Sequence, residues 1–137
     1  GYIIRENKGL KYLFVDLEKS NPKISTPDPE KGTAYSIQEI SNKFMWSVES
    51  HGETREGVLK SVLSLDFSET DLLILDEPEQ GLSLKNQAKY FRELEAMDIE
   101  VILITHSKLF IELTDKVFDV ETMKWVDSKN YLSDIIN

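Results

Sequence analysis

The chain has 137 residues, of which 40% are hydrophobic, and this is enough to bury the core of one domain but too short for two ordinary domains. Its 16 Lys and Arg residues against 25 Asp and Glu residues give a formal net charge of -9, which argues against a broad surface for nucleic acid or anionic membranes. The absence of cysteine excludes a disulfide framework and a thiolate metal site and suits the cytoplasm, and no transmembrane run or signal peptide is present.

The first third of the chain is expected to hold short strands, a loop and one helix. Residues 2–4 and 12–15 are β-rich runs separated by a polar turn, which favours a hairpin or two strands of one sheet. Residues 19–33 hold three of the four prolines and predict a loop, and residues 36–44 have apolar side chains at helical spacing. Because the chain starts at Gly1 and enters a strand-like run at once, we expect a piece of a longer protein or a processed product.

The middle of the chain contains one helix followed by the most apolar strand. The helix is expected to begin at or just after Gly52, with acidic residues in its first turns where the helix dipole favours them. Its apolar face comprises Val58, Leu59, Val62, Leu63 and Leu65. Leu72-Leu73-Ile74-Leu75 is a short aliphatic run bounded by polar residues, which predicts a strand buried on both faces as in a parallel sheet, and Pro78 ends it.

The last third of the chain continues the alternation of helices and strands. Ser83 is the expected N-cap of a helix whose apolar face comprises Leu84, Ala88, Phe91, Leu94 and Met97. Residues 101–105 predict a second buried strand, and a helix over residues 108–113 follows. A hairpin turning near residues 121–122 and a helical turn over residues 131–136 complete the chain, and Trp125 is expected to be a packing residue.

Polar side chains stand directly after the two apolar strands. Asp76 and Glu77 follow the first strand, and His106 follows the second. A right-handed strand, helix, strand connection makes the two strands parallel neighbours, so these side chains should lie together at the sheet edge where α/β proteins bind ligands. Adjacent carboxylates repel each other unless a cation or a proton offsets them, and magnesium bound to a polyphosphate would do so. Glu79 and Gln80, further along, are expected to be solvated.

Three motifs resemble those of one family. Leu72 to Pro78, with its Asp-Glu pair, resembles the Walker B motif of ABC-type ATPases, and Ser50-His51-Gly52-Glu53 resembles a variant of their signature motif. Ile104-Thr105-His106-Ser107 resembles their switch histidine motif, and the order and intervals of the three motifs also match the family. The resemblance implies an α/β fold of the P-loop NTPase class, with parallel core strands, flanking helices and peripheral β-hairpins, and a single domain over residues 1–137 that forms the carboxyl-terminal part of an ABC-type ATPase domain.

The resemblance also implies roles for the residues of the Walker B and histidine motifs. Asp76 would hold Mg²⁺, Glu77 would orient or deprotonate the attacking water, and His106 would hydrogen-bond the γ-phosphate of ATP. Gly81-Leu82-Ser83 occupies the place of the loop that crosses the dimer interface, although it is equally well described as a turn and a helix cap.

The signature motif implies a dimer. Ser50, His51, Gly52 and Glu53 would form an anion site at a helix start for the nucleotide held by the opposite protomer, so the active unit is a head-to-tail dimer with ATP between two subunits. The partner is a second copy or another ABC-type subunit. An indirect role on DNA follows only by analogy with soluble relatives.

The sequence departs from the family at one essential place. It contains no glycine-rich phosphate loop ending in Lys and Ser or Thr, so the isolated chain is expected to bind ATP weakly or not at all and to hydrolyse none. The glutamine loop is not located, since the turn at Arg5-Glu6-Asn7 is well placed but Gln38 lies close to the signature. Two functions follow: an ATPase completed by a Walker A segment, or a non-catalytic regulatory or binding module that acts with a partner subunit.

Overall fold

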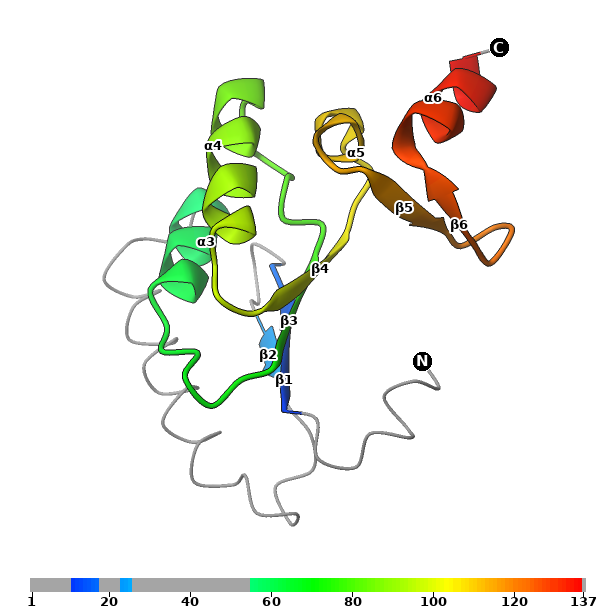
Figure 1. Cartoon of the computed structure of the whole chain (residues 1–137). Helices are drawn as coiled ribbons and strands as arrows, with labels where there is room; N and C mark the ends of the chain where they lie inside the picture. Colours follow the sequence, from blue (N-terminus) through cyan, green and yellow to red (C-terminus); the bar gives the residue numbers. More distant parts are fainter. Residues whose placement is uncertain (1–10, 18–22, 26–54, 137) are drawn as a thin grey trace.

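The computed structural model describes residues 11–17, 23–25 and 55–136 (Figure 1). The elements in these ranges are β1 (Tyr12–Asp16), β2 (Lys23–Ser25), α3 (Arg55–Leu63), β3 (Leu72–Asp76), α4 (Leu84–Glu95), β4 (Glu100–Ile104), α5 (Lys108–Leu113), β5 (Lys116–Asp119), β6 (Lys124–Asp127) and α6 (Ser128–Ile136). The expected strand at residues 2–4 and the expected helix at residues 36–44 lie outside the described residues.

Four strands form one mixed sheet in the order β2-β1-β3-β4. β1, β3 and β4 are parallel, and β2 pairs with β1 in the antiparallel direction. The prediction of an α/β fold with parallel core strands and flanking helices is therefore confirmed. The prediction of a loop over residues 19–33 is wrong at Lys23–Ser25, because pairing with β1 gives these three residues strand structure that their own sequence does not indicate.

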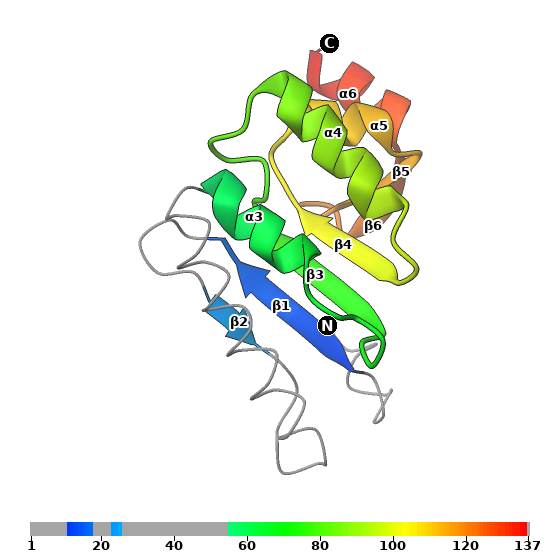
Figure 2. The same ribbon diagram turned by 90° about the vertical axis from the view of Figure 1, so that its left-hand side faces the viewer.

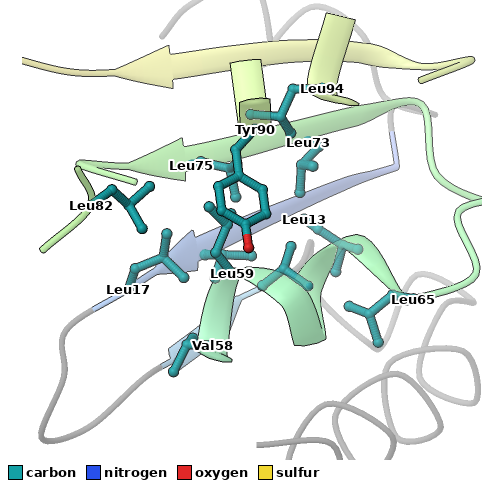
Figure 3. Packing of buried hydrophobic residues seen from close by; sticks show 12 residues of the cluster. Leu13, Leu17, Val58, Leu59, Leu65, Leu73, Leu75, Leu82, Tyr90 and Leu94 are labelled. Atoms are coloured by element: carbon teal, nitrogen blue, oxygen red, sulfur yellow. The ribbon is translucent and has the colours of Figure 1, made fainter. Parts of the chain in front are cut away.

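The hydrophobic core lies between the sheet and the helices α3 and α4. Both helices cover the same face of the sheet (Figure 2). Leu73 and Leu75 point from β3 into this core and are fully buried, and Tyr90 of α4 is 1% exposed among them (Figure 3). The Tyr90 hydroxyl donates a 2.9 Å hydrogen bond to Glu56 Oε1 in the first turn of α3, so the two helices are joined by a polar contact as well as by packing.

The predicted cap of α4 is confirmed, but its predicted apolar face is partly wrong. Ser83 Oγ accepts a 3.2 Å hydrogen bond from the backbone N–H of Asn86, as an N-cap does. Leu84, however, is 70% exposed, because the buried face of the helix runs through Tyr90 and Leu94 and Leu84 lies off that stripe.

The prediction that β4 is buried on both faces is also wrong. Among the described strands, β4 lies at the edge of the sheet, and its residues alternate between exposed and partly buried. Val101 and Leu103 pack against the core, whereas Ile102 and Ile104 on the other face are 47% and 45% exposed. β3, in contrast, has the burial on both faces that its aliphatic run predicted, since Leu72 to Leu75 are all buried.

The last three elements extend away from the four-stranded sheet (Figure 1). α5 docks on α4 through Phe110, whose ring centroid lies 5.6 Å from that of Phe91. The predicted hairpin is confirmed as β5 and β6, and α6 follows it. Trp125 packs edge-on against Phe118, with 5.5 Å between the ring centroids, but it is 70% exposed, so this packing is at the surface of the hairpin and not in the core. Within the described ranges, no helix has the length and apolar character needed to cross a bilayer.

Candidate functional site

The carboxyl ends of β3 and β4 bring the predicted site residues together. Asp76 is the last residue of β3 and stands between Asp16 of β1 and Ile104 of β4 in the register of the sheet. Glu77 follows β3 directly, and Thr105 and His106 follow β4. The expectation that Asp76, Glu77 and His106 lie at one sheet edge is therefore confirmed.

Glu77 has a left-handed backbone conformation, with φ at 50°. A residue with a Cβ atom adopts this conformation at a cost of about 1–2 kcal/mol, so it persists where surrounding contacts impose it. One such contact is the 2.7 Å hydrogen bond from the Glu77 N–H to the carbonyl oxygen of Ile104. The chain thus turns sharply at the end of β3 while remaining tied to β4.

The Glu77 carboxylate has a different partner on each oxygen. His106 Nε2 lies 3.3 Å from Oε1, and Gln80 Nε2 donates a 2.5 Å hydrogen bond to Oε2. The Glu77 side chain is 34% exposed and that of His106 is 87% exposed. The carboxylate is therefore oriented from two sides and remains open to solvent, which is the arrangement that a general base acting on water requires.

Asp76 lies in a region of concentrated negative charge. Its pKa is raised, first by partial burial and then by the neighbouring charges of Glu77 and Asp16, while His106 acts in the opposite direction. A bound cation would reverse this shift, because it stabilises the ionised carboxylate. The carboxylates at this edge thus have the chemistry of a cation site. Among the described residues, however, no group of three or more His, Asp or Glu side chains is arranged to hold a metal ion alone.

Glu79 is not solvated as expected but buried, with 9% of its surface exposed. Its Oε1 accepts a hydrogen bond from the hydroxyl of Thr105, while its Oε2 is buried without a hydrogen-bond partner of normal geometry among the described residues. Burial raises the pKa of Glu79, whereas the Thr105 hydroxyl and the backbone N–H groups of Glu79 and His106 act to lower it. No local pattern predicts this burial, since Glu79 lies in a polar turn after a proline and its partner comes from another strand.

Ser107 links the same region to α4 and α5. Its N–H donates a 2.9 Å hydrogen bond to Thr105 Oγ1, and its own Oγ caps α5 by accepting from the N–H of Phe110 at 3.1 Å. The Ser107 hydroxyl also donates a 2.7 Å hydrogen bond to Gln87 Oε1 on α4. His106 therefore lies between two residues whose side chains are held by the rest of the fold.

Gly81, Leu82 and Ser83 have local roles in the turn that leads to α4. Gly81 has φ at 78°, a conformation that glycine adopts without a steric penalty. Leu82 is 9% exposed and belongs to the core cluster, and Ser83 is the N-cap of α4. These contacts explain the loop as a turn and a cap, and the part of it that remains accessible to another subunit is Gly81 and Ser83, both of which are exposed.

The remaining predicted site residues, Ser50, His51, Gly52 and Glu53, lie outside the described residues. A hollow of about 350 Å³ lies between the ends of α3 and α4 and the strands that follow them. It is lined by Phe67, Ser68, Thr70, Met97, Asp98 and Ile99. These residues come before β3 and β4 in the chain, so the hollow is at the opposite end of the strands from Glu77 and His106 and does not belong to the candidate site.

Comparison of the chain with protein-family models, with curated proteins and with solved structures gave no match.

Proposed function

We propose that this chain supplies the catalytic half of an ABC-type ATPase domain. The observation that supports this most directly is the pairing of Glu77 with His106 at 3.3 Å, beside Asp76, at the carboxyl ends of adjacent parallel strands. An acid for a cation, an acid for water and an imidazole that can donate to a phosphate oxygen are groups that fit the cleavage of a terminal phosphate.

In this proposal Glu77 acts on the attacking water. Phosphoryl transfer needs a positioned nucleophile and neutralised charge more than covalent catalysis. Gln80 holds one carboxylate oxygen of Glu77, and His106 lies beside the other, so the carboxylate has a defined orientation toward solvent. His106 is exposed enough to donate a hydrogen bond to a phosphate oxygen approaching from outside.

The carboxylates at this edge fit a magnesium ion that is shared with a nucleotide. Mg²⁺ is usually held by one or two carboxylates, with water and phosphate oxygens completing its coordination, so it does not need three protein ligands. Asp76 would hold the ion, because its carboxylate lies beside those of Glu77 and Asp16, and a cation there would offset both its burial and this negative charge. When bound, Mg²⁺ would neutralise charge on the phosphates of ATP.

The proposed active unit needs two further parts. The phosphate loop, which the 137 residues do not contain, would come from another segment or subunit. The loop Ser50 to Glu53 would contact the nucleotide held by the opposite protomer, in a homodimer or with an ABC-type partner. An indirect role on DNA remains an analogy with the family that the motifs resemble.

The test compares the chain with a longer product that includes the coding sequence upstream of Gly1. We expect the longer product to hydrolyse ATP in the presence of Mg²⁺ and to dimerise with ATP, whereas the chain alone does neither. Glu77→Gln in the longer product should lower hydrolysis by about 10²–10⁴-fold and leave ATP binding intact. Hydrolysis that is unaffected by Glu77→Gln would refute the proposed role of this residue.

The absence of a phosphate loop supports a second candidate function. The chain would then be a non-catalytic module with part of the ABC fold that contributes its signature loop to the nucleotide of a partner subunit. A coding sequence that starts near Gly1, together with a longer product that does not hydrolyse ATP, would favour this function over the first.

A further inference from the structure

Glu79 is the buried acid that the proposed chemistry does not use. It lies in the turn after β3, and its side chain reaches the residue that follows β4. A carboxyl group loses solvation when it is buried, so a glutamate at a 9% exposed position is costly unless its contacts have a purpose. An aliphatic residue of similar size would fill this position without that cost.

The contacts of Glu79 converge on the residues that flank His106. Thr105 donates its hydroxyl hydrogen to Glu79 and accepts a hydrogen bond from the Ser107 N–H at 2.9 Å through the same oxygen. The backbone N–H of His106 is also close enough to the Glu79 carboxylate to lower its pKa. The Glu79 carboxylate and the Ser107 N–H thus meet at one oxygen, Thr105 Oγ1, which ties the residues on the two sides of His106 together.

His106 itself has little else to hold it. Its side chain is 87% exposed, and Glu77, at 3.3 Å, is the one ion-pair partner found for it in the described part of the chain. An exposed imidazole keeps a defined position only if its backbone is fixed, because the side-chain contact alone is weak. The distance between His106 and Glu77 therefore depends on what holds residues 105–107.

We propose that Glu79 is a positioning residue whose buried carboxyl group, hydrogen-bonded to Thr105, holds the 105–107 segment against the end of β3 and so sets the distance between His106 and Glu77. The importance of that distance rests on the proposed function, but the positioning itself does not. Glu79 contacts no reacting group in this proposal and acts only through Thr105 and the backbone.

Two substitutions separate the hydrogen bond from the packing. Glu79→Gln keeps an acceptor oxygen for the Thr105 hydroxyl, whereas Glu79→Leu has a similar size and no acceptor. The full chain is studied by NMR, with amide hydrogen exchange measured at His106 and Ser107 and with the ring resonances of His106 recorded before and after Glu77→Gln. Exposed Glu95 on α4 provides the control, Glu95→Gln.

We expect Glu79→Leu to speed exchange at Ser107 by about tenfold relative to the amides of β3, because the Thr105 hydroxyl that accepts from the Ser107 N–H is no longer held by Glu79. The His106 ring resonances should then no longer respond to Glu77→Gln. Glu79→Gln should preserve both the slow exchange and the response, and Glu95→Gln should change neither.

Three outcomes would overturn the proposal. In the first, Glu79→Leu changes neither the amide exchange at Ser107 nor the response of the His106 ring to Glu77→Gln. In the second, Glu79→Gln loses the slow exchange and the ring response as fully as Glu79→Leu does, and in the third, Glu79→Leu speeds exchange equally at Ser107 and throughout β3. If Glu79→Leu does not fold, Thr105→Val removes the same hydrogen bond from the other side. Because valine also removes the acceptor of the Ser107 N–H, only the response of the His106 ring to Glu77→Gln is read in that variant, and we expect this response to be lost. Because no nucleotide is used, a longer product that fails to hydrolyse ATP would refute the proposed function without affecting this result.

Discussion

His106 Nε2 lies 3.3 Å from Glu77 Oε1, although the His106 side chain is 87% exposed and that of Glu77 is 34% exposed. A contact this open to water contributes at most about 1 kcal/mol to folding, because solvent screens it and the side chains lose freedom in forming it. Stability is therefore a poor explanation for the pair, and under the proposed function the two side chains act at the sheet edge instead.

His106→Ala should accordingly change stability very little. We expect the free energy of unfolding to fall by less than about 0.5 kcal/mol, since the substitution removes only an exposed side chain. Urea denaturation of the full chain measures this. The loss of a buried contact typically costs about 2 kcal/mol or more. A loss of that size would show that His106 is a structural residue and would weaken its assignment to the site.

The left-handed conformation of Glu77 predicts an unusual order of stability between two variants. Glu77→Ala and Glu77→Gly both remove the contacts to Gln80 and His106, but only glycine relieves the steric cost of φ at 50°. We expect the Gly variant to be more stable than the Ala variant by about 1 kcal/mol. At a position with a negative φ the order is reversed, and a variant with glycine is less stable than one with alanine. Equal stabilities, or a more stable Ala variant, would contradict the backbone strain.

Buried Glu79 should make stability depend on pH. Its pKa is raised above the ordinary value of 4.5, chiefly by burial, so the folded chain binds this proton more tightly than the unfolded chain does. The contribution is fully present below pH 4.5 and is lost as the pH rises through the higher pKa of the folded state.

Comparison with Glu79→Gln isolates this effect, because the amide does not titrate while other groups, including Asp76, titrate in both proteins. We expect wild-type stability to decline relative to Glu79→Gln as the pH increases from 4.5 toward neutrality. Urea unfolding at a series of pH values measures the difference. A difference that is the same at every pH would mean that Glu79 does not titrate above its ordinary range.

The two neighbouring strands β3 and β4 should respond differently to the same substitution. Ile74 and Ile102 are opposite each other in the register, but Ile74 is 8% exposed and Ile102 is 47% exposed. Ile74→Thr should destabilise the chain by about 2 kcal/mol or more, because it loses buried apolar surface and places a hydroxyl in an apolar environment. Ile102→Thr keeps a β-branched residue at an open position and should cost less than about 1 kcal/mol. Thermal or urea unfolding of both variants provides the comparison.

The Tyr90 hydroxyl bond between α4 and α3 should have a measurable but modest effect. Tyr90→Phe removes the 2.9 Å hydrogen bond to Glu56 and keeps the ring in the core, so we expect a loss of about 1 kcal/mol. Lys60, which is 3.8 Å from the same Glu56 oxygen and half exposed, is the matched control. Lys60→Ala should lower the free energy of unfolding by no more than about 0.5 kcal/mol. If Lys60→Ala is more destabilising than Tyr90→Phe, then Lys60, and not Tyr90, is the more important partner of Glu56.

Several elements could be predicted from the sequence because their signals are local. The aliphatic run of β3, the Ser83 cap of α4 and the apolar face of α3 each depend on residues a few positions apart. The same reasoning located Glu77 and His106 at one edge, because a strand, helix, strand unit has a restricted handedness. Their roles in cleaving ATP remain a proposal that rests on the resemblance of the motifs.

The sequence by itself thus determined the strands and helices between residues 55 and 136 and the polar residues that follow the parallel strands, whereas β2 depends on its pairing with β1. The tertiary structure alone decided that β4 is an edge strand with Ile102 and Ile104 exposed, that Leu84 lies outside the core, and that Glu79 is buried against Thr105. The physical reason is that burial depends on which elements pack on a given side, and those neighbours come from distant parts of the chain. The left-handed turn at Glu77 follows the same rule, since contacts from β4 help to hold a conformation that its own residue type disfavours.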